Sequence, residues 1–412
     1  MSKVVKIVAY EMLHQGARPT VAARMTLDNG REVETSVATA DHAYDYQTQQ
    51  LLDNDTERYL GNGVLRAVHY INTLIGPKLA GVSPTKQNEV DGWLLAADGT
   101  PDKSKLGVNT IYAISSLFLK AGAVDAGLSL FEYINNYYNT RHSETSVKIE
   151  KVSSPIIPMV TQHEYPKLFD FREFCVVPSS SYTFSKALEI AMSIYLETRR
   201  SMKSAIITGN IDVINTVTSA IDASRLKLAS DIFLAISIKA TNFYQGGSYN
   251  IKEKNQPVKA PDYLDFLSHM SKKYYPLFLI DPVVPDDLPS WKALGQTINE
   301  NAYLAGDDLI GSNPARLTKM LDEKVCTSFF IKPPEVGTIT EVSDLVNVLR
   351  KHSLNYALSA SLYETNDSLL ADLSVAMGGD FVKFGLPTYG EHFSKYNRMV
   401  EIENEILGRK KV

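Results

Sequence analysis

The chain has 412 residues, of which 44% are hydrophobic and 22% are charged, and this predicts a globular protein of about two domains. Its net charge of −5 argues against general binding to nucleic acid or to anionic membranes, because no basic field covers the surface. The two cysteines, Cys175 and Cys326, each lie in an apolar strand-like run, which excludes a disulfide framework and a cysteine-rich metal site and favours a reducing, cytoplasmic compartment.

The first third of the chain is predicted to contain strands and then helices. Apolar alternation marks three strands, the last two joined by a hairpin turn at Asp28, Asn29 and Gly30. A long helix follows later, apolar on most sides and therefore expected to be buried. No stretch approaches 18 uncharged apolar residues, so a soluble protein is expected. The strands are 3–10, 20–27 and 32–38, and the long helix is 106–133.

Strands and helices alternate in the rest of the chain, which is typical of a β/α barrel. The first two of its eight predicted strands follow each other without a full helix between them. The predicted strands are 156–160, 173–177, 233–238, 277–280, 303–305, 328–331, 356–359 and 381–384. A polar, charged stretch separates the two halves. The predicted domains are therefore an α+β domain at 1–136, a linker at 137–153 and a barrel domain at 154–412.

Charged residues follow two successive barrel strands. Asp307 and Asp308 come after the apolar run 303–305, and Lys332 comes after 328–331. Because the carboxyl ends of barrel strands carry the catalytic groups of such folds, these residues are candidates for a site.

Several short sequence motifs occur in the same order as in a known protein family. The chain resembles the enolase (phosphopyruvate hydratase) family over essentially its whole length, which implies a TIM-like barrel behind a smaller α+β domain. The strings are RYLGNGV at 58–64, DGTPDKSKLGVNTI at 98–111, GDDL at 306–309, IK at 331–332 and FVKFGLP at 381–387.

The resemblance implies a magnesium site that this chain does not keep in full. The family's three carboxylate ligands correspond to Ser237, Ile280 and Asp307. Isoleucine cannot bind a cation and serine is a weak neutral ligand, so Asp307 is a remnant. No cofactor is expected, and Mg²⁺ enters only if a residual site of the family type works. Strand alternation predicts that the neighbouring Asp281 points to the other face.

The resemblance implies roles in proton transfer for three charged residues. Lys332 corresponds to the general base, Lys383 to a lysine that contacts the substrate carboxylate, and Glu173 to a glutamate that positions the leaving hydroxyl. A lysine acts as a base only if its pKa is lowered. The family's proton-donating loop has no counterpart, since 200–229 contains no glutamate and no Gly-Gly pair. A structural interpretation stays open, in which Asp307, Lys332, Lys383 and Glu173 neutralise one another.

The family's substrate-binding residues are replaced. Its phosphate-binding histidine and arginine correspond to Ala360 and Ser361, which removes a guanidinium suited to phosphate. His42 lies where the family has a mobile loop, and His163 is one place from a family histidine. No substrate-binding residue is retained.

Three interpretations of function follow. The preferred one is an enolase-like pseudoenzyme that lacks dehydratase activity and acts as a binding or structural component. The alternatives are a repurposed lyase acting on another small carboxylate, and residual enolase activity. A homodimer or larger protein assembly is expected from the resemblance, with no nucleic-acid or membrane partner. Cytoskeletal or flagellar association is left open.

Overall fold

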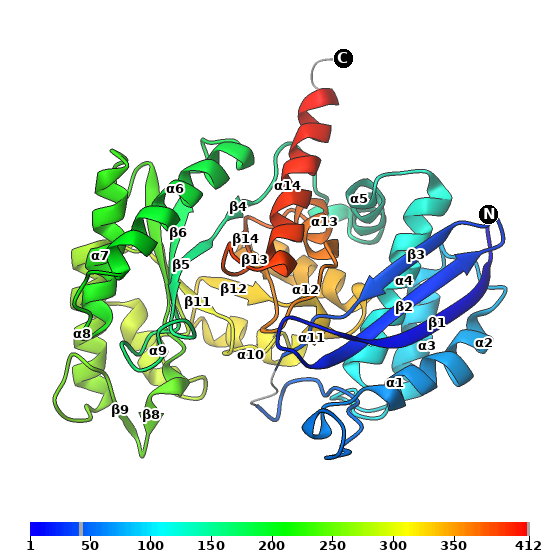
Figure 1. Cartoon of the computed structure of the whole chain (residues 1–412), viewed down its shortest axis with the longest axis horizontal. Coiled ribbons are helices and arrows are strands. Elements are labelled where there is room, and N and C mark those ends of the chain that lie inside the picture. The colour runs from blue at the N-terminus through cyan, green and yellow to red at the C-terminus, as the bar shows by residue number, and fades with distance from the viewer. Residues whose placement is uncertain (41–43, 410–412) are drawn as a thin grey trace.

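The computed structural model describes residues 1–40 and 44–409. Figure 1 shows a smaller unit of sheet and helices, formed by the first part of the chain in blue and cyan, beside a larger barrel formed by the rest in green to red. His42, a position singled out in the sequence, lies outside the described residues. No single helix in the described ranges is long and apolar enough to cross a membrane; helices α4 (Val108–Ala126) and α5 (Leu130–Arg141) meet that test only as a pair bent by 104°.

The first unit is a three-stranded antiparallel sheet backed by helices. The order is β1-β2-β3, and the predicted hairpin turn is present, with Gly30 at φ 79° donating its N–H to the carbonyl of Leu27. Helix α4 packs against β2, β3 and α3. The elements are β1 (Val4–Leu13), β2 (Pro19–Leu27), β3 (Glu32–Ser36), α1 (Leu65–Tyr70), α2 (Gly76–Leu79), α3 (Gln87–Asp98), α4 (Val108–Ala126) and α5 (Leu130–Arg141).

The long helix predicted at 106–133 is wrong, because the chain turns sharply within it. Helix α4 ends at Ala126, and Gly127 adopts φ 67°, the left-handed conformation that commonly ends a helix. Helix α5 then starts at Leu130 and continues to Arg141, past the predicted start of the linker at 137. The predicted burial of α4 is confirmed, since every residue from 108 to 119 is buried.

The larger unit is a nearly closed barrel. Its nine strands follow the order β4-β14-β13-β12-β11-β10-β7-β6-β5. Because β4 and β5 flank Ile156, the two ends of the sheet belong to one continuous segment, 154–161, which closes the ring. The strands are β4 (Ser154–Pro155), β5 (Ile157–Thr161), β6 (Glu173–Pro178), β7 (Ile232–Ser237), β10 (Phe278–Ile280), β11 (Tyr303–Gly306), β12 (Ser328–Ile331), β13 (Asn355–Ser359) and β14 (Phe381–Lys383).

Strand β6 runs antiparallel to both of its neighbours, β5 and β7, because no full helix separates β5 from β6. The other pairings described in the sheet are parallel. All eight predicted barrel strands are present within one or two residues of their predicted limits. The first residue of β6, rather than its last, therefore lies at the barrel end where the other strands finish.

Helices cover the outside of the barrel, and a small apolar cluster fills its inside. That cluster includes Cys175, Phe278, Ile280 and Phe330. A short hairpin, β8 (Tyr244–Gln245) and β9 (Ser248–Tyr249), follows β7. The helices are α6 (Phe184–Met202), α7 (Asn210–Ala223), α8 (Ala260–Tyr274), α9 (Leu288–Gly295), α10 (Pro314–Glu323), α11 (Pro333–Val336), α12 (Ile339–Lys351), α13 (Leu369–Ala376) and α14 (Gly390–Arg409).

Candidate active site

Charged side chains gather where the parallel strands end. The register pairs Ser237 at the end of β7 with Ile280 at the end of β10, and also with Glu173 at the start of β6. We call the charged side chains gathered at this end of the barrel the charged mouth. It consists of Arg172, Glu173, Lys239, Asp281, Asp307, Asp308, Lys332, Glu335 and Lys383. Because the carboxyl ends of barrel strands are where such folds carry their chemistry, the charged mouth is the candidate active site.

Lys332 and Asp307 form an ion pair across neighbouring strands. The Lys332 Nζ lies 2.6 Å from the Asp307 Oδ1, and 15% and 19% of the two side chains are exposed. Burial disfavours the charged amine, but the carboxylates of Asp307, Glu335 and Asp308 outweigh it and raise the pKa of Lys332 well above its ordinary value. In this state Lys332 is an ammonium group.

Lys383 and Glu173 form a second ion pair, between β14 and β6. Burial alone would raise the pKa of the Glu173 carboxyl, but the charges of Lys383 and Arg172 hold it below its ordinary value. The four charged residues singled out in the sequence are thus brought to one place. They pair as two lysines with two carboxylates.

Asp281 joins this group, and the prediction that it points to the other face is wrong. Strand β10 ends at Ile280, and Asp281 adopts φ 47°, so the alternation of the strand stops before it. Its carboxylate accepts the backbone N–H groups of Asp307 and Asp308, each at 2.9 Å. Burial and the negative charges of Asp308 and Asp307 raise the pKa of Asp281 to about 8.

The residues at the family's magnesium positions do not fit that ion. Ile280 is 1% exposed and lies in the apolar cluster inside the barrel, so it offers no oxygen. The ligand atoms of Asp281, Asp307 and Asp308 lie within 4.8 Å of one another, close enough to hold a metal. Those acids are already engaged, by two backbone N–H groups, by Lys332 and by Lys239, and a magnesium ion would have to displace these donors to complete its shell of oxygens.

Two basic side chains of the charged mouth were missed in the sequence. Lys239 follows β7 with φ 50°, and its Nζ lies 3.1 Å from the Asp308 Oδ2. Arg172 precedes β6, with its Nε 3.9 Å from the Glu173 Oε1. Burial disfavours its charge, but Glu173, Asp308 and Asp307 raise the pKa of Arg172 above its ordinary value. Their positions directly beside strand ends are a signal that could have identified both.

Two tyrosines from the first unit cover the mouth. Tyr44 donates its hydroxyl to the Asp308 Oδ2 at 3.1 Å, and Tyr46 donates to the Asp308 carbonyl at 2.6 Å. Their rings stack with centroids 5.1 Å apart, and the Arg316 guanidinium lies 3.9 Å from the Tyr46 ring centroid. Burial and the Asp308 charge raise the pKa of Tyr44 well above its ordinary value. The two units therefore meet over the site.

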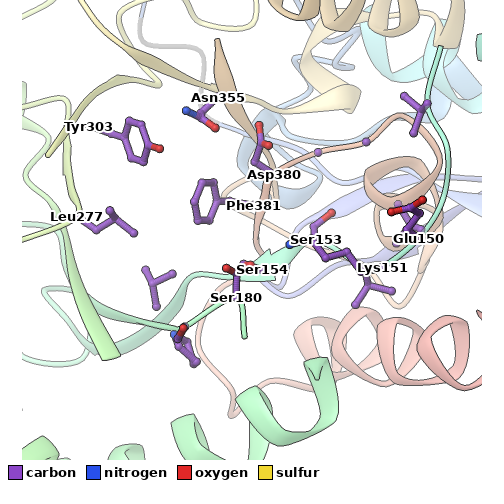
Figure 2. Close-up of a pocket in the computed structure, with 18 of the residues that line it drawn as sticks. Glu150, Lys151, Ser153, Ser154, Ser180, Leu277, Tyr303, Asn355, Asp380 and Phe381 are labelled. Carbon is purple, nitrogen blue, oxygen red and sulfur yellow. The ribbon is translucent and has the colours of Figure 1, made fainter. Parts of the chain in front are cut away.

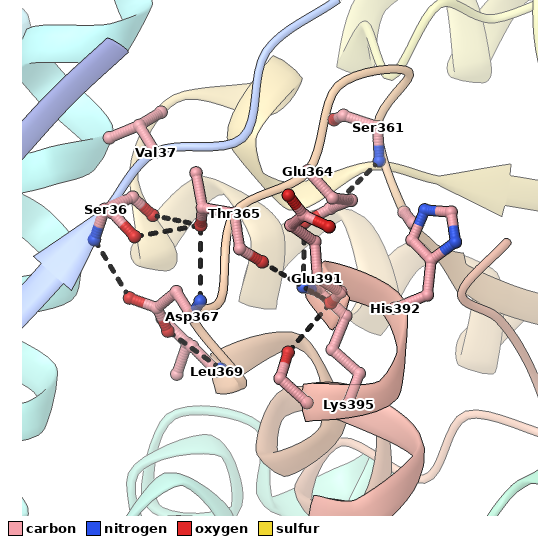
Figure 3. Close-up of polar contacts among 12 residues, drawn as sticks. Ser36, Val37, Ser361, Glu364, Thr365, Asp367, Leu369, Glu391, His392 and Lys395 are labelled. Atoms are coloured by element: carbon pink, nitrogen blue, oxygen red, sulfur yellow. Dashed lines mark hydrogen bonds and ion pairs between the residues drawn. The ribbon is translucent and has the colours of Figure 1, made fainter. Parts of the chain in front are cut away.

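In the segment after β13, Ser361 stands where the resemblance places a phosphate-binding arginine, and it joins a hydrogen-bond network with two glutamates. The Ser361 hydroxyl donates to the Glu335 Oε1 at 3.1 Å, and its backbone N–H donates to the Glu364 Oε1 at 2.8 Å. Figure 3 shows this second bond, with Lys395 on the other side of Glu364; their ion pair measures 2.9 Å and is almost fully buried. Burial raises the pKa of Glu335. Ala360 lies beside this network and brings no polar group to it.

The remaining candidates from the sequence take no part in the mouth. His163 is exposed on the loop after β5. Within 200–229, Asp212 lies at the start of α7, where it accepts the N–H and hydroxyl of Thr208 at 2.8 and 2.7 Å. It lies in the first turn of that helix, and none of its described contacts is with the charged mouth.

A large cavity lies at the opposite end of the barrel. It has a volume of about 780 Å³ and is lined by residues at or next to the starts of strands, among them Leu277, Tyr303, Asn355 and Phe381. Figure 2 shows these side chains with Asp380 and the serines 153, 154 and 180. Since none of the paired acids and lysines described above lines it, the charged mouth is the stronger candidate.

The chain is similar to known proteins along its whole length. The family model for the N-terminal domain of enolase matches residues 4–134, and the model for the C-terminal TIM barrel domain of enolase matches 160–412. An enolase of Elusimicrobium minutum is 31% identical over 100% of this chain and 97% of its own length. An enolase 2 of Pseudomonas syringae pv. syringae is 30% identical over 99% and 97%. An enolase of Anaplasma marginale is 28% identical over 98% and 95%.

These comparisons correct the preferred interpretation from the sequence. The prediction of an inactive relative with a binding or structural role is wrong, since both domains match and the relatives that align end to end are named enolases. That interpretation relied on the family ligands being replaced by Ser237 and Ile280, on the missing proton-donating loop and on the replaced substrate-binding residues. It did not consider Arg172 and Lys239, which bring positive charge to the same mouth.

Proposed function

Because the chain belongs to the enolase family, we propose that it is a carbon-oxygen lyase that reversibly removes water from a small 3-hydroxy carboxylic acid. The observation that carries this proposal is the placement of Lys332 and Lys383, each paired with an acid, at the ends of two strands that flank β13. One amine can exchange a proton with the substrate's α-carbon, while the other holds the substrate carboxylate.

Lys332 is the group that takes the proton. As the Cα–H bond breaks, the proton goes to its Nζ and the electron pair moves into the substrate carboxylate to give an enediolate; the pair then returns to form the Cα–Cβ double bond as the Cβ–O bond breaks. The Lys383 ammonium stabilises the negative charge that builds on the substrate carboxylate, which is the part of such a reaction where a fixed charge contributes most.

The leaving hydroxide needs a proton to depart as water. Glu335 is a buried carboxyl group with a raised pKa, and it lies in contact with the Ser361 hydroxyl. We assign it the role of proton donor, which the family's loop fills elsewhere. Glu335 already belongs to the charged mouth, so the proton donor does not require the missing loop.

The protonation state of Lys332 limits the rate of dehydration. Since its pKa is raised, the free amine needed for dehydration is scarce at neutral pH. The ammonium form is the proton donor for the reverse reaction, the addition of water to an unsaturated acid. Dehydration is therefore expected to quicken as the pH rises.

The substrate is a small acid, and 2-phosphoglycerate is the first to test. Ser361 occupies the position of a phosphate-binding arginine, so 3-hydroxy acids without phosphate are the second group to test. The experiment is proton exchange at Cα in D₂O, followed by NMR, together with appearance of the unsaturated product. It detects proton abstraction even where elimination is slow.

The control variants are Lys332→Met, expected to abolish exchange, and Arg200→Gln, a change at a side chain that is 82% exposed on α6, expected to leave it intact. Folded wild-type protein that exchanges no α-proton of either group of acids, with or without magnesium, would overturn the proposal.

A further inference from the structure

We propose that Arg172 and Lys239 together bind the anionic group of the substrate and provide the positive charge that a divalent cation would otherwise supply. The inference rests on the proposed function for the chemistry that follows binding. The ligand class is a small carboxylate with a second anionic group, either another carboxylate or a phosphate.

Arg172 is positioned as an anion-binding group. It directly precedes Glu173, the residue that starts β6 at the charged mouth, and its backbone N–H donates to the carbonyl of Ile238, which fixes it beside the end of β7. Within the described residues its ion pair is the long contact of 3.9 Å to Glu173, and 30% of its side chain is exposed. The planar guanidinium fork therefore remains open to a carboxylate or a phosphate, which it matches with two parallel hydrogen bonds.

Lys239 brings a second charge to the position next to the replaced ligands. It lies two residues after Ser237, and its left-handed backbone (φ 50°) lets the side chain fold back to within 3.1 Å of Asp308, with 23% of it exposed. Asp308 also accepts a hydrogen bond from Tyr44, so it keeps a partner when the ammonium turns toward a ligand.

The charges of Arg172 and Lys239 account for the replacement of the magnesium ligands by Ser237 and Ile280. Ser237 and Ile280 cannot form the oxygen shell that magnesium requires, while one guanidinium and one ammonium together carry two positive charges, the charge of one such ion. Arg172 leads into β6 and Lys239 follows β7, and Ser237 at the end of β7 pairs with Glu173 of β6 and with Ile280 of β10. The charge of Arg172 acts on Glu173, the partner of Lys383, and Lys239 contacts Asp308, which is next in the chain to Asp307, the partner of Lys332.

The test measures binding by calorimetry in the presence of EDTA, with 2-phosphoglycerate, malate and inorganic phosphate as probes. Wild-type protein is expected to bind at least one of the two acids without metal. Malate and 2-phosphoglycerate distinguish a dicarboxylate from a phosphorylated acid, and inorganic phosphate reports whether phosphate alone is enough.

The variants separate the two groups. Arg172→Gln is expected to weaken binding about ten-fold or more and Arg172→Lys to restore part of it, since a lysine keeps the charge but not the fork. Because Lys239→Met leaves Asp308 without its ammonium, the double variant Lys239→Met/Asp308→Asn keeps the test valid if the single variant unfolds. Arg200→Gln is the control, and circular dichroism checks that each variant is folded.

Each outcome bears on the inference separately from the proposed function. Binding that requires magnesium, binding that both substitutions leave unchanged, or no binding of any probe in EDTA overturns it. Turnover that requires magnesium would leave the proposed lyase in place and remove only this inference. Conversely, binding in EDTA that depends on Arg172, without proton exchange at Cα, would keep the inference and remove the lyase.

Discussion

The Nζ of Lys332 lies 2.6 Å from the Oδ1 of Asp307, across the ends of β12 and β11. The same contact that neutralises both groups holds the lysine in the form that cannot take a proton. Any catalysis of dehydration by this mouth must therefore loosen that pair, and this sets the first prediction.

Replacing Asp307 by Asn is expected to shift the pH dependence of α-proton exchange to lower pH. Asp307 is the first of the charges that raise the pKa of Lys332, so its loss lowers that pKa and makes the free amine available nearer neutrality. The measurement is the exchange rate in D₂O from pH 6 to 10. A profile that stays in place would contradict the assignment of Lys332 as the base. Glu323→Gln, an exposed acid of α10 paired with Lys292, is the matched control.

Replacing Glu335 by Gln is expected to slow water elimination by about 10²-fold, the lower end of what a positioned acid contributes, while α-proton exchange continues. The amide keeps a contact with the Ser361 hydroxyl but carries no transferable proton. The two rates are read in one NMR experiment. If both fall equally, Glu335 acts on structure and is not the donor.

The buried pair between Lys395 and Glu364 is expected to matter for folding. Lys395 is 1% exposed, and its ammonium also donates to the carbonyls of Thr365 and Glu391. Lys395→Met would leave the Glu364 carboxylate unpaired in the interior, at a cost of about 3–5 kcal/mol in the free energy of unfolding. Urea denaturation measures this. The double variant with Glu364→Gln should recover part of the loss, and equal losses in both would show that the charge is unimportant.

His392 is expected to make the protein less stable in mild acid. Burial lowers its pKa below the ordinary 6.5, and its Nδ1 lies 2.8 Å from the Leu386 carbonyl. As the pH falls below about 6.5 the unfolded chain takes up a proton that the folded protein refuses, so stability declines, by up to about 1.4 kcal/mol per pH unit. Urea denaturation at pH 7.5, 6 and 5 should show a shallower decline for His392→Gln. His269→Gln, at a side chain 77% exposed, should leave the slope unchanged.

The sequence predicted the barrel well because its strands are short apolar runs separated by helices, a pattern that a buried parallel sheet requires. The helix predicted at 106–133 failed, because apolar spacing continues through Gly127 and only the left-handed turn at that glycine breaks it. Periodicity reports which side of an element is buried. It does not report where two helices of similar composition are separated by a turn.

The site was predicted in part, and the failures have two causes. Asp307 and Lys332 directly follow strands and were located from strand ends, while Lys383 and Glu173 were located from the resemblance to the family. Asp281 and Lys239 lie just past strand ends with φ 47° and 50°, a conformation in which alternation no longer says where a side chain points. Arg172 was missed because β6 is antiparallel to both of its neighbours. In such a strand the preceding residue, and not the following one, lies at the charged mouth.

The reversed direction of β6 also affects how this mouth can be altered. Within the segment 162–172 that leads into it, Phe169 and Phe171 are buried in the core, while the connection 163–168 lies largely at the surface and can change in composition without disturbing the strand order of the ring. A library of variants limited to this connection would sample new partners for the substrate while Lys332 and Lys383, which belong to other strands, keep their places. Substrate preference and proton transfer are thus carried by separate pieces of the chain, and one can be engineered while the other is left alone.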